Sequence, residues 1–451
     1  EIGVRLVGSE MCIRDRFAMA DEKNWIREAM FYHIYPLGFT GAPLRNEGEA
    51  TAGGRILEVL DWIEHFKELG INAIYFGPIF ESVSHGYDTT DYYQTDSRLG
   101  SKEDFKKVFT ALHENGIRVI VDGVFNHVGR KFFAFLDVQK NLEQSDYKDW
   151  FCNLNFSWQS PLGDSFSYEN WHGAAELVKL NLRNPAVCEH LLGAVGMWMD
   201  ELGIDGLRLD AADCVDREFF KRLHSFTKGK REDFWLMGEI IHGDYRVWAN
   251  DEMLDSVTNY ECWKGIYSSH NDKNYFEIAY SLKRQFGQGG LYENLCLYNF
   301  LDNHDVNRIG SLLKQRENLK NAYTLLYMMP GIPSIYYGSE WGIEGVKGQG
   351  MDADLPLRPK LDLEEMCAQE TDLPAHIREL AKIRKESDAV KYGAYDEVLV
   401  RNKQFVFARR SGEQYKVIAL NLTDHAETLH FSYQGKEYEV LLEAYTSKIM
   451  E

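Results

Sequence analysis

The chain has 451 residues, of which 44% are hydrophobic and 13% aromatic, so it can bury a large core in one big domain with an appendage or in a few domains. The net charge of −20 excludes nucleic acid and anionic membranes as expected partners. The seven cysteines show no CxxC or His/Cys spacing, which excludes a disulfide framework and a zinc site and favours a reducing, cytoplasmic compartment. No apolar run in the sequence is long enough to span a bilayer.

The first residues have neither helical nor strand periodicity. Residues 11–16 look like a translated sequencing adapter of the transposon-end type. We therefore expect residues 1–18 to be an artefactual or disordered leader and the natural start to lie near Met19, which leaves no room for a signal peptide before the first strand.

From Phe31 onward, short apolar runs alternate with segments of helical periodicity. Several runs are apolar throughout, which is typical of parallel strands covered on both faces. The predicted strands are 31–35, 71–76, 117–122, 207–210, 234–237, 255–260, 295–300 and 332–337. The predicted helices are 56–66, 105–112, 187–202, 218–226, 276–286, 321–328 and 377–383. This regular alternation predicts an α/β fold, a (β/α)8 TIM barrel, rather than a doubly wound sheet.

Two stretches interrupt the alternation. Residues 128–175, after the third strand, are rich in Phe, Trp, Asn and Ser without sustained periodicity, and we expect a small inserted domain over the barrel mouth. Residues 389–451 contain short β-type runs separated by turn residues, which predicts a C-terminal antiparallel β-sandwich domain. The catalytic barrel would then comprise residues 19–127 and 176–388.

Carboxylates follow the ends of three predicted strands. Asp210 ends the fourth strand, Glu239 follows the fifth, and Asp305 follows the seventh. Arg208 and Asp210 share one face of their strand, because side chains repeat every second residue. Alone, this pair is equally compatible with a structural ion pair at the rim of a sheet. The recurrence of acids at the C-terminal ends of several strands favours an active site, because that end carries catalysis in TIM barrels.

Paired carboxylates without metal-ligand spacing or a phosphate-binding loop indicate glycosidic chemistry. In a retaining glycosidase, one carboxylate attacks the sugar and a second acts as acid and then base. Arg208 favours an ionised Asp210 as the nucleophile. Glu239 follows Gly238 on an apolar strand without an adjacent cation, which suits an acid of raised pKa.

From Phe31 to the C-terminus, the chain resembles the α-amylase family, glycoside hydrolase family 13. The matching blocks, in order, are residues 122–127 (DGVFNH), 177–181 (LVKLN), 206–212 (GLRLDAA), 238–240 (GEI) and 300–305 (FLDNHD). The resemblance implies Asp210 as nucleophile, Glu239 as acid/base and Asp305 as transition-state stabiliser. It also implies a substrate-binding set that consists of Tyr87, Asp122, His127, Arg208, His304 and Arg308.

Within this family, the run at residues 84–93 (SHGYDTTDYY) resembles the neopullulanase, cyclomaltodextrinase and maltogenic amylase group. Asp213-Cys214 stands where many α-amylases have Lys-His, whose histidine helps to hold calcium. Asn126 remains as one possible ligand, so we expect no required cofactor and leave a structural calcium ion open.

The resemblance implies a retaining α-glucan hydrolase that cleaves α-1,4 and possibly α-1,6 bonds in maltooligosaccharides, cyclodextrins or pullulan. Two alternatives stay open. A transglycosylase would share every catalytic residue and differ only in whether water or a sugar reaches the glycosyl-enzyme. A non-catalytic carbohydrate-binding relative would be expected to lose members of the carboxylate set, all of which are present here. Linkage preference, exo or endo action and oligomeric state are left open.

Overall fold

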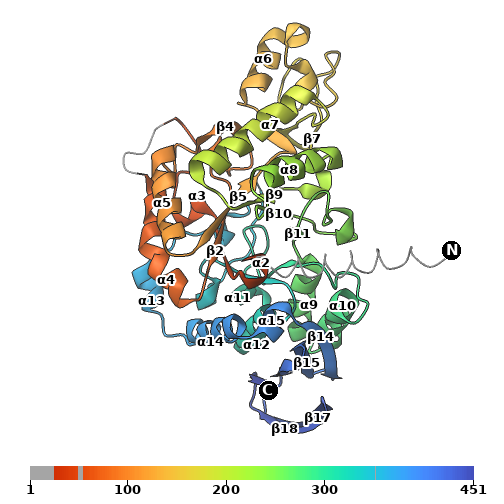
Figure 1. The fold of residues 1–451 in the computed structure, drawn as a ribbon. Helices are drawn as coiled ribbons and strands as arrows, with labels where there is room; N and C mark the ends of the chain where they lie inside the picture. Colours follow the sequence, from red (N-terminus) through yellow and green to blue (C-terminus); the bar gives the residue numbers. More distant parts are fainter. Residues whose placement is uncertain (1–24, 49–53, 351) are drawn as a thin grey trace, which may run out of the picture.

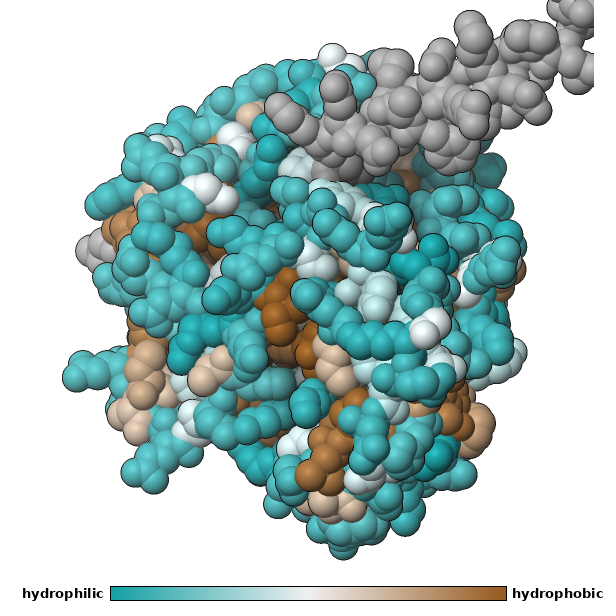
Figure 2. All heavy atoms as spheres, turned by 60° about the horizontal axis from the view of Figure 1, so that its bottom comes forward, coloured by the Kyte–Doolittle hydropathy of each residue, from teal (hydrophilic) through white to brown (hydrophobic). Residues whose placement is uncertain are grey.

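The computed structural model describes residues 25–48, 54–350 and 352–451. The predicted leader, residues 1–18, lies outside these ranges. Figure 1 shows a barrel with the segment around α6 at one end of the molecule and the C-terminal sheets at the opposite end. The face shown in Figure 2 is mostly hydrophilic, with apolar side chains in separate patches, as the net charge leads one to expect.

The eight predicted barrel strands are all present and all pair in parallel. They are β1 (Phe31–Ile34), β2 (Ala73–Phe76), β5 (Arg118–Gly123), β9 (Gly206–Leu209), β10 (Trp235–Gly238), β11 (Ser256–Val257), β12 (Tyr298–Phe300) and β13 (Ile332–Tyr336). Their spatial order is β11-β10-β9-β5-β2-β1-β13-β12. A parallel bridge between Thr258 and Tyr298 joins the two end strands and closes the barrel.

Alternate residues of these strands point to two separate cores. Phe31, Tyr75 and Trp235 belong to the apolar cluster inside the barrel. Tyr32 and Ile74 belong to the larger cluster between the strands and the surrounding helices. Because both faces are covered, the strands read as continuous apolar runs, and this is why the sequence predicted a parallel sheet.

Helices surround the barrel (Figure 1). Those before the inserted segment are α2 (Trp25–Glu28), α3 (Pro36–Phe39), the 3-10 helix η1 (Arg55–Trp62), α4 (Ile63–Glu68) and α5 (Lys102–Glu114). Those after it are α7 (Pro185–Met197), which continues as a π-helix (Trp198–Leu202), α8 (Arg217–Lys230), α9 (Tyr260–Asn271), α10 (Phe276–Phe286), α11 (Ile309–Leu312), α12 (Leu319–Met328), α13 (Leu363–Cys367), α14 (Leu373–Glu386) and α15 (Asp388–Tyr392).

Two predicted elements differ from the structure. The segment 56–66 is not one α-helix but a 3-10 helix followed by α4. The predicted strand 255–260 ends early, and α9 begins at Tyr260 because the side chain of Asn259 accepts a hydrogen bond from the Cys262 amide and caps the helix.

The stretch after β5 forms a small antiparallel sheet and one longer helix. The sheet contains β6 (His127–Gly129), β8 (Ala174–Lys179) and β7 (Asn170–Trp171) in that order, and the helix is α6 (Phe133–Asn141). His127 pairs with Lys179 in this sheet, so a residue of the 122–127 motif belongs to the inserted segment as much as to the barrel. A second hairpin, β3 (Phe80–Ser82) and β4 (Thr89–Thr95), follows β2.

The C-terminal region forms two antiparallel sheets. One contains β14 (Ala394–Val400), β15 (Gln404–Ser411), β16 (Gln414–Asn421) and β19 (Ser447–Met450), and the other contains β17 (Glu427–Tyr433) and β18 (Lys436–Leu442). Val406 and Val417 from the first sheet share an apolar cluster with Leu429 and Val440 from the second. The predicted antiparallel β domain is confirmed.

Candidate active site

The predicted carboxylates gather at one end of the barrel because neighbouring strands end at matching registers. Asp122 pairs with Arg208 across β5 and β9, and Gly238 pairs with Leu209 across β10 and β9. The next residues, Asp210 and Glu239, therefore leave adjacent strands side by side. Gly206 permits this approach, because a Cβ atom there would lie only 2.4 Å from the Trp235 carbonyl oxygen.

Arg208 is the centre of the cluster. Its Nη1 atom lies 2.9 Å from Asp122 Oδ1 and 2.8 Å from Asp210 Oδ1, and its Nη2 atom lies 3.0 Å from Glu239 Oε2. The guanidinium is buried, with 3% of the side chain exposed, whereas Asp210 and Glu239 retain 13% and 12%. The arginine thus holds two carboxylates whose remaining oxygen atoms are open to the barrel mouth.

The turn after β9 adds a backbone contact between the two acids. Ala211 has a left-handed backbone conformation with φ of 44°, and its amide donates a hydrogen bond to Glu239 Oε2 over 3.1 Å. A non-glycine residue in this conformation is uncommon and costs backbone energy. The conformation fixes the carboxylate of Glu239 next to the residue that follows Asp210.

Asp305 and His304 approach from the seventh strand. His304 Nε2 lies 3.0 Å from Asp305 Oδ2, and Arg358 Nη2 donates to Asp305 Oδ1 over 3.1 Å. Arg358 also donates to the His304 carbonyl oxygen and lies over the Tyr35 ring, 4.4 Å from its centre. Asp305 keeps 33% of its side chain exposed, which makes it the most accessible of the three predicted catalytic acids.

Tyr87 joins the two halves of the cluster from the loop between β3 and β4. Its hydroxyl donates to Asp122 Oδ2 over 3.0 Å and contacts His304 Nε2. The Tyr87 and His304 rings are nearly parallel, with centres 5.5 Å apart. Tyr75 also donates to Asp122, over 2.8 Å, so two tyrosines and one arginine fix this aspartate.

His127 lies next to Tyr87, with its ring buried. The side chain is 1% exposed, and its Nε2 atom has no hydrogen-bond partner among the described residues. Burial lowers the pKa of His127 to about 3, so the ring is neutral at pH 7. Its centre lies 5.9 Å from the ring of Trp171, whose indole N–H also lacks an acceptor in the described part of the chain. Two unsatisfied nitrogen atoms side by side suit a ligand with hydroxyl groups.

The surroundings of Glu239 and Asp305 shift the pKa values of these two carboxyl groups in opposite directions. Burial raises the pKa of Glu239, and the negative charge of Asp305 adds to the rise. For Asp305, burial opposes ionisation, but His304 and Arg358 outweigh it and hold the pKa below its ordinary value. Glu239 therefore favours the protonated form and Asp305 the ionised form.

The prediction that Arg208 keeps the pKa of Asp210 low is wrong. Burial raises the pKa of Asp210 well above its ordinary value, and the negative charges of Glu239 and Asp122 raise it further. Arg208 acts in the opposite direction, but one guanidinium is shared among three carboxylates. The cluster has an excess of negative charge and tends to bind a proton.

Arg308, a predicted substrate-binding residue, lies outside the carboxylate cluster in the structure. The side chain is fully buried, and it donates to the carbonyl oxygens of Tyr337 and Leu357 and to the hydroxyl of Ser339. Its guanidinium lies over the Tyr336 ring, 4.1 Å from the centre. Because its contacts are to the protein's own backbone, Arg308 is a structural residue and not a sugar ligand.

Three residues that contact the cluster were absent from the predicted set. They are Tyr75, Trp171 and Arg358. Tyr75 lies within an apolar strand, and Arg358 follows Asp305 by 53 positions without a local motif. Only the inward register of Tyr75, two residues after Ala73 on β2, is a signal that sequence reasoning could have used.

One candidate calcium ligand, Asn126, lies next to the cluster. Among residues 25–48, 54–350 and 352–451, no group of three or more His, Cys, Asp or Glu side chains lies close enough to hold a metal ion. The side-chain oxygen of Asn126 is buried without a hydrogen-bond partner there, but calcium takes six to eight oxygen ligands. Asn126 is thus one candidate ligand, and a structural calcium ion stays a prediction.

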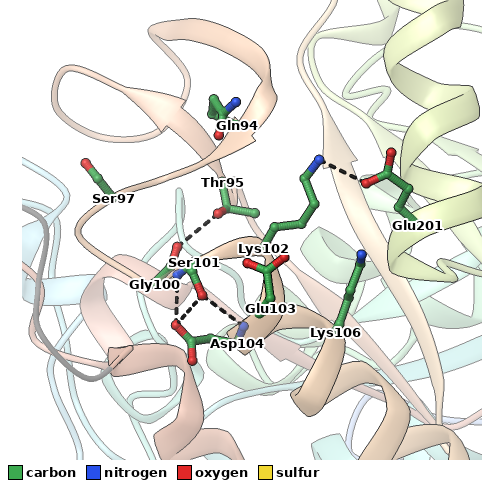
Figure 3. A pocket seen from close by; sticks show the side chains of 10 residues that line it. All are labelled: Gln94, Thr95, Ser97, Gly100, Ser101, Lys102, Glu103, Asp104, Lys106 and Glu201. Carbon is green, nitrogen blue, oxygen red and sulfur yellow. Dashed lines mark hydrogen bonds and ion pairs between the residues drawn. The ribbon is translucent and has the colours of Figure 1, made fainter.

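A surface cavity of about 640 Å³ lies apart from the carboxylate cluster. It is formed between the end of β4, the start of α5 and the π-helix, and none of the cluster residues lines it. Figure 3 shows Lys102 reaching across it to Glu201, an ion pair of 3.0 Å, while Ser101 and Asp104 cap α5. None of the predicted catalytic carboxylates reaches this cavity.

Comparison with known proteins identifies the family of the chain. Residues 13–391 match the family described as alpha amylase, catalytic domain. A cyclomaltodextrinase from a Bacillus species is 31% identical over 428 residues, 90% of this chain and 74% of that protein. Neopullulanase 2 of Thermoactinomyces vulgaris is 34% identical over 352 residues, 71% and 58% of the two chains. An intracellular maltogenic amylase of Bacillus subtilis is 31% identical over 386 residues, 81% and 63%.

Solved structures of carbohydrate-active enzymes superpose on the chain over most of its length. The cyclic α-maltosyl-(1→6)-maltose hydrolase of Arthrobacter globiformis, in complex with maltose, superposes with a TM-score of 0.82 at 26% identity and covers 95% of this chain and 100% of its own. A debranching enzyme of Nostoc punctiforme soaked with acarbose has a TM-score of 0.78 at 28% identity, with coverage of 94% and 98%. The described residues include no helix long and apolar enough to cross a membrane.

Proposed function

The chain belongs to the α-amylase family of glycoside hydrolases, and we propose that it is a retaining α-glucan hydrolase that cleaves α-1,4 and α-1,6 glucosidic bonds. Its substrates in this proposal are maltooligosaccharides, cyclodextrins or pullulan. The observation that carries it is the bridge by Arg208, which holds Asp210 and Glu239 on adjacent strand ends with Asp305 opposite. The relatives named as cyclomaltodextrinase and neopullulanase support this substrate class.

Both Asp210 and Glu239 have raised pKa values, so the reaction requires that the proton of the cluster lies on Glu239 and that Asp210, beside the Arg208 guanidinium, is ionised. Glu239, with its raised pKa, donates a proton to the glycosidic oxygen as the bond to the leaving sugar breaks. Asp210 attacks the anomeric carbon and forms a covalent glycosyl-enzyme. Glu239, now ionised, takes a proton from the incoming water, which displaces Asp210 and releases the sugar with its original anomeric configuration.

Asp305 and the histidines serve the sugar itself. The low pKa of Asp305 keeps it ionised, so it can accept hydrogen bonds from ring hydroxyls and stabilise positive charge at the anomeric carbon. His127 has a free Nε2 atom for another hydroxyl, and Tyr87 offers its ring beside His304. In this proposal Arg208 aims Asp210 and Glu239 rather than touching the sugar.

A second activity, transglycosylation, would use the same catalytic residues and differ only in whether water or a sugar hydroxyl reaches the glycosyl-enzyme. Product analysis at high maltose concentration separates the two activities, because transfer yields oligosaccharides longer than the substrate.

We also propose a cytoplasmic location. The named intracellular amylase is similar over most of the chain, and the described cysteines are all free thiols, as expected in a reducing compartment. Fractionation of the source cells with an antibody to the protein tests this. Recovery in the culture medium would contradict it.

The proposed reaction is tested with pullulan, γ-cyclodextrin, maltotriose and panose as separate substrates, with product identification. We expect turnover of at least one α-1,4-linked substrate, and α-anomers as the first products by proton NMR. First products of β configuration would contradict the double displacement. An absence of any hydrolysis would contradict the function.

A further inference from the structure

A second pocket lies at the seam between the barrel and the C-terminal domain. It has a volume of about 460 Å³, within the range of about 300–1,000 Å³ typical of small-molecule sites. The groups that matter for recognition are Arg316, Lys320, Trp341, Asp372, Tyr445 and Thr446. They come from the 3-10 helix Arg316–Asn318 and the start of α12, the 3-10 helix Ser339–Trp341 after β13, the residue before α14 and the turn before β19.

The seam is held rigid on both sides of the pocket. Asn321 on α12 donates to the Asn421 carbonyl oxygen over 2.9 Å, and the hydroxyls of Thr324 and Ser447 lie 2.8 Å apart. These buried contacts join the helix to β16 and β19 next to Tyr445. The pocket is therefore preformed, which lowers the entropy lost when a ligand binds.

Tyr445 provides an aromatic surface in this pocket. Its backbone has φ of 55°, a left-handed conformation that a tyrosine seldom adopts. No hydrogen bond of its hydroxyl occurs among the described residues, whereas its amide donates to the Thr423 carbonyl oxygen over 2.9 Å. The ring, with a small exposed part of Trp341 nearby, is available to a ligand.

The charged side chains that line the pocket balance in sign: they are Arg316 and Lys320, and Glu317 and Asp372. Arg316 Nη1 lies 3.3 Å from Glu344 Oε1, and Lys320 pairs with Asp372. With no excess of positive charge, the pocket does not suit phosphate or another anion. Paired charges beside an aromatic ring suit a neutral ligand with many hydroxyl groups, which accept from the cations and donate to the carboxylates.

We propose that this seam pocket is a second, non-catalytic binding site for a neutral α-linked gluco-oligosaccharide, with a glucose ring stacked on Tyr445. The ligand class rests on the proposed function, but the site does not take part in the reaction. The 640 Å³ cavity in Figure 3 is a contrast, because no aromatic ring lines it.

The experiment measures binding of maltohexaose by calorimetry to the full chain carrying Asp210→Asn, which prevents turnover. Tyr445→Gly removes the ring in this background, and glycine adopts the left-handed conformation without cost. Tyr445→Phe is the matched control that keeps the ring. We expect about two equivalents of bound sugar for Asp210→Asn alone and for Asp210→Asn with Tyr445→Phe. We expect about one equivalent for Asp210→Asn with Tyr445→Gly, because stacking on the ring supplies most of the affinity of the seam pocket.

Activity on maltotriose provides an independent measurement. Tyr445→Gly in the wild-type chain should leave kcat/KM for this short substrate unchanged, since Tyr445 lies outside the catalytic cluster. If Tyr445→Gly does not fold, Ala444→Arg fills the same pocket and should remove the same equivalent of sugar.

Two results overturn the proposal: a single equivalent bound to Asp210→Asn that Tyr445→Gly leaves intact, or two equivalents that survive both pocket variants. Failure of the proposed function gives a different pattern. Asp210→Asn would then bind one equivalent that Tyr445→Gly removes, so the seam site would stand while the catalytic assignment fell.

Discussion

Two buried arginines, Arg208 and Arg308, serve this barrel in opposite ways. Arg208 bonds to three carboxylates, two of which remain partly exposed at the mouth. Arg308 donates to backbone carbonyls and a serine hydroxyl and is closed from solvent. The comparison teaches that burial of a charge does not mark a site. What distinguishes the site is that the Asp210 and Glu239 carboxylates, which accept hydrogen bonds from Arg208, remain partly exposed to solvent.

The largest expected effect is on the carboxylate that Arg208 aims. Asp210→Asn keeps the shape of the side chain but removes the nucleophile, so we expect kcat on maltotriose to fall on the order of 10⁴-fold or more. Far-UV and near-UV circular dichroism spectra of the variant that match those of the wild type serve as the control for folding. Full activity of the variant would remove Asp210 from the mechanism.

The second effect concerns stability. Arg308→Met leaves the Tyr337 carbonyl oxygen without its side-chain donor, leaves the Leu357 carbonyl oxygen with the Tyr336 hydroxyl alone, and removes the cation near Asp302. We expect a loss of about 3 kcal/mol in the free energy of unfolding. Urea denaturation measures it, and kcat of the folded fraction should be retained. A variant with lowered kcat and unchanged stability would return Arg308 to the substrate-binding set.

The third effect is a pH dependence of stability. Because the pKa of Asp210 is raised on folding, the folded state binds more protons than the unfolded state above about pH 4, and stability falls as pH rises to the folded pKa. Asp210→Asn cannot ionise. We expect it to be more stable than wild type at pH 7, by about 1.4 kcal/mol per unit of the raised pKa, with no gain below about pH 4.

Thermal melts of the two proteins between pH 3.5 and 7 measure this difference. Asp164 is a suitable contrast, because hydrogen bonds from Arg130, Ser160 and Gln139 overcome its burial and lower its pKa to about 2. Its contribution is present above about pH 4 and is lost as pH falls toward 2, which is the opposite direction. A constant difference between Asp210→Asn and wild type across the range would contradict the raised pKa.

The smallest effect is at the edge of the site. Trp171→Ala removes the ring beside His127, and we expect KM for γ-cyclodextrin to rise about fivefold, equivalent to about 1 kcal/mol, with kcat nearly unchanged. Trp171→Phe, which keeps a ring, should recover most of the affinity. Equal KM values for all three proteins would remove Trp171 from the substrate path.

The sequence predicted those elements and residues that are marked by a pattern of neighbouring residues. The eight strands were found because each is a short apolar run, and Asp210, Glu239 and Asp305 were found because each follows such a run. Asp302 and Asp305 stand three residues apart in one motif, yet Asp302 is buried and accepts from Ser339 and the Ile309 amide. Only the path of the chain after β12 decides which of the two reaches the mouth.

The missed features depend on contacts between distant parts of the chain. Arg358 reaches Asp305 from a loop that no periodic pattern describes. The pKa of Asp210 depends on how many acids share Arg208, which the sequence does not state. Helix α9, Tyr260–Asn271, was not among the predicted helices, because its first residue was taken as part of the preceding strand and the cap Asn259 stands only two residues after β11.

The pairing of His127 with Lys179 has an evolutionary consequence. Asp210 and Glu239 are fixed by barrel strands alone, so insertions in the segment between β6 and β8 can accumulate without moving them. His127 is shared with the inserted sheet, so a change in that sheet can also shift the nitrogen that we propose as a sugar ligand. Substrate range can therefore diversify among descendants of this chain while the bond-breaking chemistry stays the same.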